Sequence, residues 1–208
     1  MKRKWIVAAL VSLLLSACIP TMKYTWTKEN YTAKKFDNIL VLAITQNMEA
    51  RTIFENTIVK ALEEEGFHAE NSLKLFPPIV SIEKISEEGI ESKIKASDYD
   101  AVIVSSLVDV KAQEVYDYVD YYRPYPYFYP RHIYYGYGYA YRPGYYRQET
   151  SFVVESRLFD TSATTKEDAI VWSGQSELID PVSYESGAKD HAYSMVKTLL
   201  KSGVLQQP

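Results

Sequence analysis

Cysteine, histidine and glycine are all scarce in this chain of 208 residues, which contains one cysteine, three histidines and eight glycines. A single cysteine excludes a disulfide within the chain. The histidines, His68, His132 and His191, lie far apart, without the spacing of metal ligands or of a catalytic pair. No phosphate-binding loop and no HExxH, CxxC or GxSxG motif occurs. We therefore expect no catalytic residues, no metal site and no cofactor, and we interpret the protein as non-enzymatic.

Long apolar runs are missing after the first 15 residues. Residues 2–4 are basic, and the apolar run over residues 5–15 is too short for a bilayer core, which needs about 20 residues. This pattern predicts a secretory signal peptide over residues 1–17. The letters LSAC, which end at Cys18, resemble a bacterial lipobox, and this resemblance implies cleavage before Cys18 and its acylation with palmitate-type chains. The alternative is a short signal anchor with an incidental cysteine.

Basic residues do not gather anywhere in the chain after the predicted signal peptide. Without the signal peptide it has 20 Lys and Arg against 27 Asp and Glu, a net charge of −7. This balance argues against nucleic acid as a partner and leaves the N-terminal lipid as the expected membrane contact. Enterobacterial lipoproteins retained in the inner membrane carry aspartate after the lipidated cysteine, where this chain has Ile19. That resemblance implies a lipid-anchored protein of the outer membrane that faces the periplasm.

Residues 18–35 are polar after the cysteine and show no clear periodicity. We interpret them as the lipidated N-terminus and a tether. Residues 19–35, fully extended, would reach roughly 55 Å. The tether could then hold the folded domain away from the lipid surface.

Residues 36–204 predict a single α/β (α+β) domain. Apolar runs and alternation predict strands at 36–44, 67–71, 99–119, 150–162 and 169–180, and helical periodicity predicts helices before residue 66, at 81–97 and at 183–202. We expect Thr45 or Asn47 to cap the first helix, Gly66 to end it, and Asp180-Pro181 to begin the last one. The order predicts a mixed β-sheet of about five strands covered by about three helices.

Tyrosine is the residue in excess, because 14 of 19 tyrosines fall within Tyr116–Tyr146. Residues 117–147 predict a Tyr-rich inserted flap between the third and fourth expected strands. Tyrosine alternates with glycine or alanine over 136–141, which places rings on one side of an extended chain. The candidate binding surface comprises Tyr122, Arg123, Tyr127, Arg131, Tyr137, Tyr139, Tyr141 and Arg142. The alternative is a low-complexity loop whose rings pack on one another or on the sheet.

Four segments carry a resemblance to known proteins: FDNILVLAI, EEEGF, SDYDAVIV and SFVVESRLFDTSATTKEDAIVWSGQSE. With the last helix they resemble Gram-negative envelope lipoproteins of unknown function that carry a Tyr/Gly-rich insert. The layout is also similar to the amino-terminal domain of TolB and to the periplasmic domain of the curli-secretion lipoprotein. The resemblance covers residues 36–203 and is most telling over residues 157–174.

This resemblance implies a periplasmic interaction or envelope-assembly module with an envelope protein as partner. The alternative is an aromatic-flap binder of glycan or peptidoglycan, such as an activator of cell-wall synthesis. Protein neighbours in crosslinked cells would favour the first hypothesis, and retention on the cell-wall sacculus would favour the second.

Cys18→Ala tests the predicted anchor, because alanine cannot carry the lipid. The variant should accumulate as soluble or uncleaved protein and should not be labelled by palmitate, whereas the parent protein should be labelled and should fractionate with the outer membrane. Palmitate labelling of the variant would show that the lipobox prediction is wrong.

Overall fold

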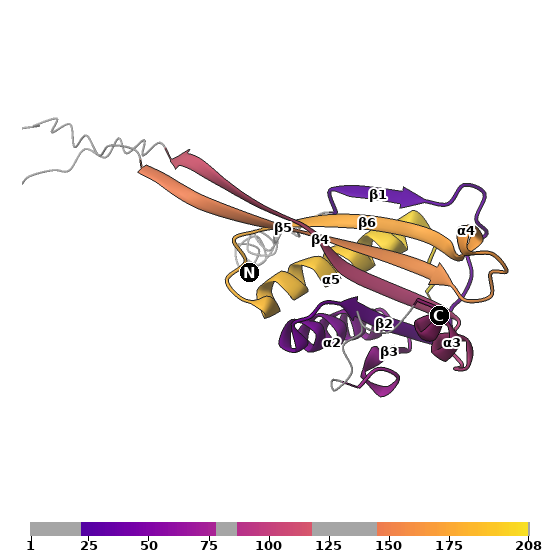
Figure 1. Cartoon of the computed structure of the whole chain (residues 1–208). Coiled ribbons are helices and arrows are strands. Elements are labelled where there is room, and N and C mark those ends of the chain that lie inside the picture. Colours follow the sequence, from indigo (N-terminus) through magenta and orange to yellow (C-terminus); the bar gives the residue numbers. More distant parts are fainter. Residues whose placement is uncertain (1–21, 78–86, 118–144, 208) are drawn as a thin grey trace, which may run out of the picture. The chain divides into compact units, whose positions relative to one another are not determined.

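A computed structural model describes residues 22–77, 87–117 and 145–207 of the chain (Figure 1). Six strands in these residues form one sheet in the order β1-β6-β5-β4-β2-β3. They are β1 (Tyr24–Thr27), β2 (Ile39–Ile44), β3 (Ala69–Asn71), β4 (Ala101–Asp117), β5 (Tyr145–Asp160) and β6 (Ile170–Ile179). β2 pairs in parallel with β3 and β4, whereas β6 pairs antiparallel with β1 and β5. The predicted mixed α/β fold is confirmed, with one more strand than expected.

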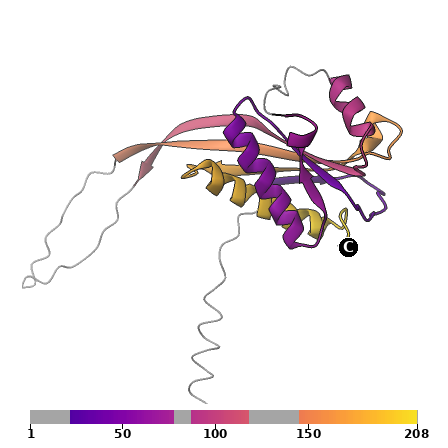
Figure 2. The same cartoon turned by 90° about the horizontal axis from the view of Figure 1, so that it is seen from below.

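Two long helices cover one face of this sheet. The helical segments are α2 (Met48–Glu64), the 3-10 helix η1 (Ser72–Lys74), α3 (Glu87–Lys95), α4 (Lys166–Ala169) and α5 (Tyr184–Ser202). α2 and α5 lie side by side and bury one apolar core against the sheet (Figures 1 and 2). Ile90 and Ile94 of α3 pack instead with Leu42 and Phe76 in a second, smaller cluster. α3 agrees with the predicted helix over the part of 81–97 that the structure describes.

Contacts divide the chain into two compact units, Met1–Val110 with Ser151–Pro208, and Lys111–Thr150. In the second unit Gln113 of β4 donates a hydrogen bond to Glu149 of β5 across 3.0 Å. The second unit spans the whole of the predicted insert at 117–147. Residues 118–144 lie outside the described residues, so the flap between these strands stays a prediction.

Local capping signals set most helix ends where the sequence indicates. Asn47 Oδ1 accepts a hydrogen bond from the backbone N–H of Ala50 at 3.0 Å, which makes Asn47 the N-cap of α2. Gly66, with φ of 91°, ends that helix, and Gly203, with φ of 74°, ends α5.

The start of α5 differs from the expected Asp180-Pro181. Ser183 is the N-cap, and it exchanges hydrogen bonds with Ser186 in a capping box. Asp180 has a left-handed φ of 41°, which turns the chain between β6 and α5. The proline therefore lies in the connection rather than in the first helical turn.

The polar segment 19–35 is not a tether along its whole length, because Tyr24–Thr27 forms the edge strand β1. The sheet supplies its hydrogen bonds: Lys23 N–H donates to Gln175 O at 2.7 Å, and Lys28 N–H donates to Val171 O at 3.0 Å. The expectation of a long tether is wrong for these residues, since pairing with a strand about 145 residues later cannot be read from local periodicity.

A close approach of side chain to backbone explains the glycine in the letters VWSG. Trp172 is fully buried in the core, and its indole ring lies over the backbone of Gly174 on the same face of β6. A Cβ at position 174 would overlap that ring, lying 2.6 Å from Cζ2 of Trp172 and 2.8 Å from Cε of Met22. Trp172 and Gly174 are therefore one packing unit.

Substitutions at Trp172 and Gly174 should be strongly coupled. Trp172→Ala should lower the free energy of unfolding by roughly 3 to 5 kcal/mol because it empties a core site. Trp172→Phe should cost much less, because it keeps a ring and removes an indole N–H that has no hydrogen-bond partner among the described residues. Gly174→Ala should cost about 1 to 3 kcal/mol through overpacking.

The cost of Gly174→Ala should shrink in a Trp172→Leu background, where the ring no longer fills the space. Denaturant unfolding of the four proteins gives this double-mutant cycle. Additive costs would contradict the packing unit.

Candidate functional site

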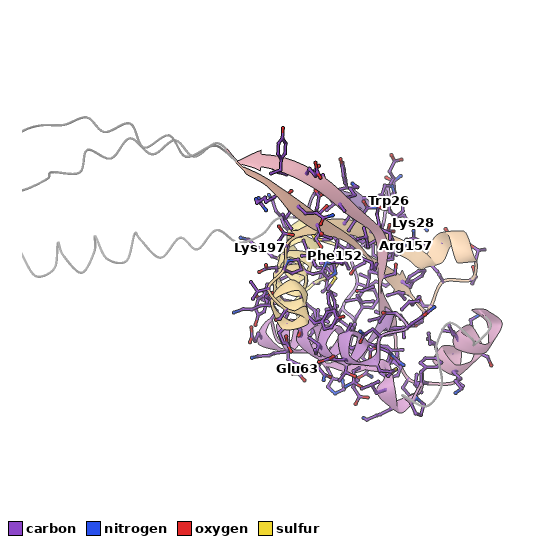
Figure 3. The ribbon with its side chains drawn as sticks, turned by 60° about the vertical axis from the view of Figure 1, so that its left-hand side comes forward. Trp26, Lys28, Glu63, Phe152, Arg157 and Lys197 are labelled. Carbon is purple, nitrogen blue, oxygen red and sulfur yellow. The ribbon has the colours of Figure 1, made fainter. Side chains whose placement is uncertain are left out.

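A pocket of about 540 Å³ lies in the first unit, between the N-terminal ends of α2 and α5 and the adjacent strands. Its wall is mainly apolar and includes Phe54 of α2, Leu107 of β4, Phe152 and Val154 of β5, and Leu178 of β6. Phe152 is labelled in Figure 3. The volume falls within the roughly 300 to 1,000 Å³ typical of ligand-binding pockets. This cavity is the candidate functional site.

Helix capping places the polar rim of the pocket. Asn47 and Ser183, the N-caps of α2 and α5, both line it. Asn47 Nδ2 also donates a hydrogen bond to the hydroxyl of Tyr184 at 3.1 Å, which joins the starts of the two helices. The opening is thus held by contacts between the helices that form it.

Two carboxylates give the rim a negative charge. Glu49 and Glu185 stand in the first turns of α2 and α5, and both line the pocket. The pKa of Glu185 is lowered by hydrogen bonds from the Ser183 hydroxyl and from the backbone N–H of Glu185 itself. An apolar interior with an acidic rim suits an apolar group that has a cation beside it.

A buried ion pair fixes the wall that β2 contributes. Glu55 Oε1 accepts hydrogen bonds from Arg51 Nε at 2.9 Å, from Ala43 N–H at 3.0 Å and from Ser72 Oγ at 2.8 Å. Its Oε2 accepts from Ser72 N–H at 2.9 Å, and Arg51 Nη2 donates to Phe76 O at 3.0 Å. The side chains of Arg51 and Glu55 are 1% and 0% exposed. The hydrogen bond from Ala43 N–H therefore fixes the end of β2, because the buried Glu55 carboxylate needs such donors in place of water.

A chain of hydroxyl groups leads from the pocket to a buried histidine. Ser105 lines the pocket, and its Oγ lies 2.6 Å from Ser156 Oγ, which lies 2.7 Å from Nε2 of His191. Nδ1 of His191 lies 2.6 Å from Ser176 Oγ, and the imidazole lies against the ring of Phe54 at 6.2 Å. Both ring nitrogens of His191 are thus satisfied by serine hydroxyl groups.

These hydrogen bonds orient the serine hydroxyl groups and the His191 imidazole, and they do not activate Ser105 as a nucleophile. Nucleophilic serine catalysis needs the base in direct contact with the hydroxyl that meets the substrate. Here His191 contacts Ser156, which is fully buried, whereas Ser105 reaches the imidazole only through Ser156. Burial also lowers the pKa of His191 to about 4, which makes the ring a weak base.

The site residues expected from the sequence stay predictions. Cys18 and the eight tyrosines and arginines of the candidate binding surface lie outside the described residues. His68 is exposed and contacts Asn38, with 2.7 Å between Nδ1 and Oδ1. In the described ranges no three His, Cys, Asp or Glu side chains are arranged to hold a metal ion.

The pocket was not predicted from the sequence. A signal was available in three serines, Ser105, Ser156 and Ser176, which occupy inward-facing positions on strands whose other inward residues are mostly apolar. Polar residues at inward positions of several strands indicate a shared buried partner.

No helix among the described residues combines the length and the apolar character that crossing a bilayer requires. No protein-family model and no curated protein matches the chain. Solved structures do resemble it at low identity.

Three of these solved structures come from different bacteria. The PelC dodecamer from Paraburkholderia phytofirmans is 14% identical, with a TM-score of 0.43 over 88% of this chain and 99% of that chain. The lipoprotein GNA1162 from Neisseria meningitidis is 14% identical, with a TM-score of 0.41 over 79% and 98%. A DUF4136 family protein from Bacteroides thetaiotaomicron is 13% identical, with a TM-score of 0.39 over 89% and 97%. The predicted similarity to TolB and to the curli-secretion lipoprotein stays a prediction.

His191 should make the protein less stable in mild acid. Its pKa of about 4 in the folded protein lies below the value of about 6.5 expected in the unfolded chain. The unfolded chain therefore binds more protons between these values, and the free energy of unfolding should fall by up to roughly 3 kcal/mol as the pH drops from 7 to 4. Denaturant unfolding between pH 7 and pH 5 measures the first part of this loss before carboxylates titrate.

Two measurements isolate the contribution of His191. NMR should show its imidazole still neutral at pH 5 in the folded protein. His191→Gln should flatten the pH dependence between pH 7 and pH 5, whatever its own stability. An imidazole that titrates near pH 6.5 in the native state would contradict the prediction.

Proposed function

We propose that this protein is a non-enzymatic, lipid-anchored protein of the outer membrane that acts in the periplasm as an interaction or envelope-assembly module. The observation that carries the proposal is the apolar pocket between the starts of α2 and α5. A pocket of this size that is lined by aliphatic and aromatic side chains is suited to take up apolar groups of a partner.

Exposed apolar side chains extend the pocket surface outward. Leu107 and Tyr184 both line the pocket and are about half exposed. Val182 is exposed next in sequence to the lining residue Pro181. Exposed apolar side chains that gather beside a cavity are typical of protein interaction sites.

The chemistry of the pocket specifies the partner segment. An apolar side chain would fill the interior, and a lysine or arginine beside it would face Glu49 and Glu185 at the rim. We therefore propose that the partner is an envelope protein that presents an apolar residue next to a basic one. Such a segment gains burial inside and favourable charge outside.

Photo-crosslinking in living cells tests the pocket. A photoreactive amino acid at position 184, on the rim, should give a discrete adduct with an envelope protein. The same amino acid at position 60 should give none, because Lys60 lies on the exposed side of α2, with a side chain 71% exposed. Ala50→Trp, which fills the pocket, should abolish the adduct from position 184.

Charge reversal supplies a matched pair of variants. Glu49→Lys should weaken the adduct severalfold, whereas Glu63→Lys, on the same helix but near its other end, should leave it unchanged (Glu63 is labelled in Figure 3). An adduct that persists in the folded Ala50→Trp protein would contradict the pocket as the interaction site.

A further inference from the structure

The edge strand β1 carries two exposed aromatic side chains close to the cysteine that is expected to bear the lipid. Tyr24 is 64% exposed and Trp26 is 50% exposed. We propose that β1 lies against the membrane surface, with Tyr24 and Trp26 seated at the interface between lipid and water. This inference rests on the proposed function, because it requires acylation of Cys18.

The length of the chain before β1 limits its distance from the lipid. Met22 packs against the main core, and Lys23 N–H is bonded to Gln175 O of β6. The domain therefore holds the chain from Met22 onward, four residues after Cys18. Four residues span at most roughly 14 Å, compared with the roughly 55 Å of the tether expected from the sequence. A lipid on Cys18 keeps this edge of the sheet beside the membrane.

Strand register places both aromatic rings on the face of the sheet opposite α5. Thr25 and Thr27 pair with Gly174 and Trp172, and Trp172 points into the core beneath α5. Neighbouring residues in a strand point to opposite faces, so Tyr24 and Trp26 lie on the other face. The two rings are two positions apart, roughly 7 Å along the strand. They therefore form one contact surface.

The same face holds a row of polar side chains beside the rings. Trp26 is opposite Ser173 of β6, which is in turn opposite Arg157 of β5. Figure 3 labels Trp26, Lys28 and Arg157 in this region. Tyrosine and tryptophan combine an apolar ring with a polar group, and they are enriched where proteins meet the headgroup layer.

Three basic side chains in and beside strands β1 and β5 are paired with acids. Lys23 bonds to Glu177, Lys28 Nζ lies 2.6 Å from Asp168 Oδ1, and Arg157 bonds to Glu155. The aromatic surface is therefore close to neutral, and its contact with lipid should depend on burial of the rings rather than on anionic headgroups. Exposed ion pairs weaken with salt, whereas burial of the rings does not.

Tryptophan fluorescence can test the contact in the full lipoprotein. Signal cleavage removes Trp5 and leaves Trp26 and Trp172, and Trp172 is fully buried. The lipidated protein should be reconstituted in phosphatidylcholine vesicles with or without brominated acyl chains. Bromine should quench most of the Trp26 emission, and 1 M salt should not relieve the quenching.

Two variants serve as controls. Trp26→Phe should remove the quenching, since only Trp172 then emits. Trp26→Phe combined with Tyr184→Trp places an exposed indole at the pocket rim instead, and this indole should not be quenched.

The outcomes separate this inference from the proposed function. If the protein floats with the vesicles but Trp26 emission is unaffected by bromine, the membrane contact is overturned while lipid anchoring stands. If purified cell-wall sacculi shift Trp26 emission and vesicles do not, the aromatic pair binds glycan and the inference is also overturned. If the protein carries no lipid and does not float, the proposed anchoring and the inference fail together.

Discussion

The buried carboxylate of Glu55 links β2, η1 and α2, and it therefore constrains how these elements of the first unit pack. Its charge, and that of Arg51, can be tolerated in the interior only if several hydrogen bonds stabilise them together. These bonds come from the end of β2, from the start of η1 and from α2 itself. The end of β2 is also the wall of the pocket, so the position of that wall depends on the same ion pair.

The two faces of the sheet have different chemistry. On the face covered by α2 and α5, an apolar core gives way to the pocket and to the buried hydroxyl groups around His191. On the opposite face, β1, β6 and β5 carry aromatic rings and paired charges. A membrane contact through Tyr24 and Trp26 would therefore leave the pocket, on the other face, free to bind a periplasmic partner.

Much of the fold could be predicted because its main signals are local. Buried strands such as Ile39–Ile44 are continuous apolar runs, and the ends of α2 and α5 are marked by Asn47, Gly66 and Gly203. The edge strand β1 could not be predicted in this way. Its four residues, Tyr-Thr-Trp-Thr, are mostly exposed, their alternating aromatic rings lie on the face away from the core, and they are ordered by pairing with β6.

The sequence by itself determined the succession of strands and helices, the expected signal peptide and the place of the Tyr-rich segment, because each depends on residues close together in the chain. Only the tertiary structure decided which side chains share a site. Ser105, Ser156 and His191 meet through strand register, and the pocket exists because two helices begin beside one another. The pairing of β1 with β6 fixes Met22 in the folded domain. Met22 lies four residues after Cys18, and this short separation then limits the distance from the domain to the lipid expected on Cys18.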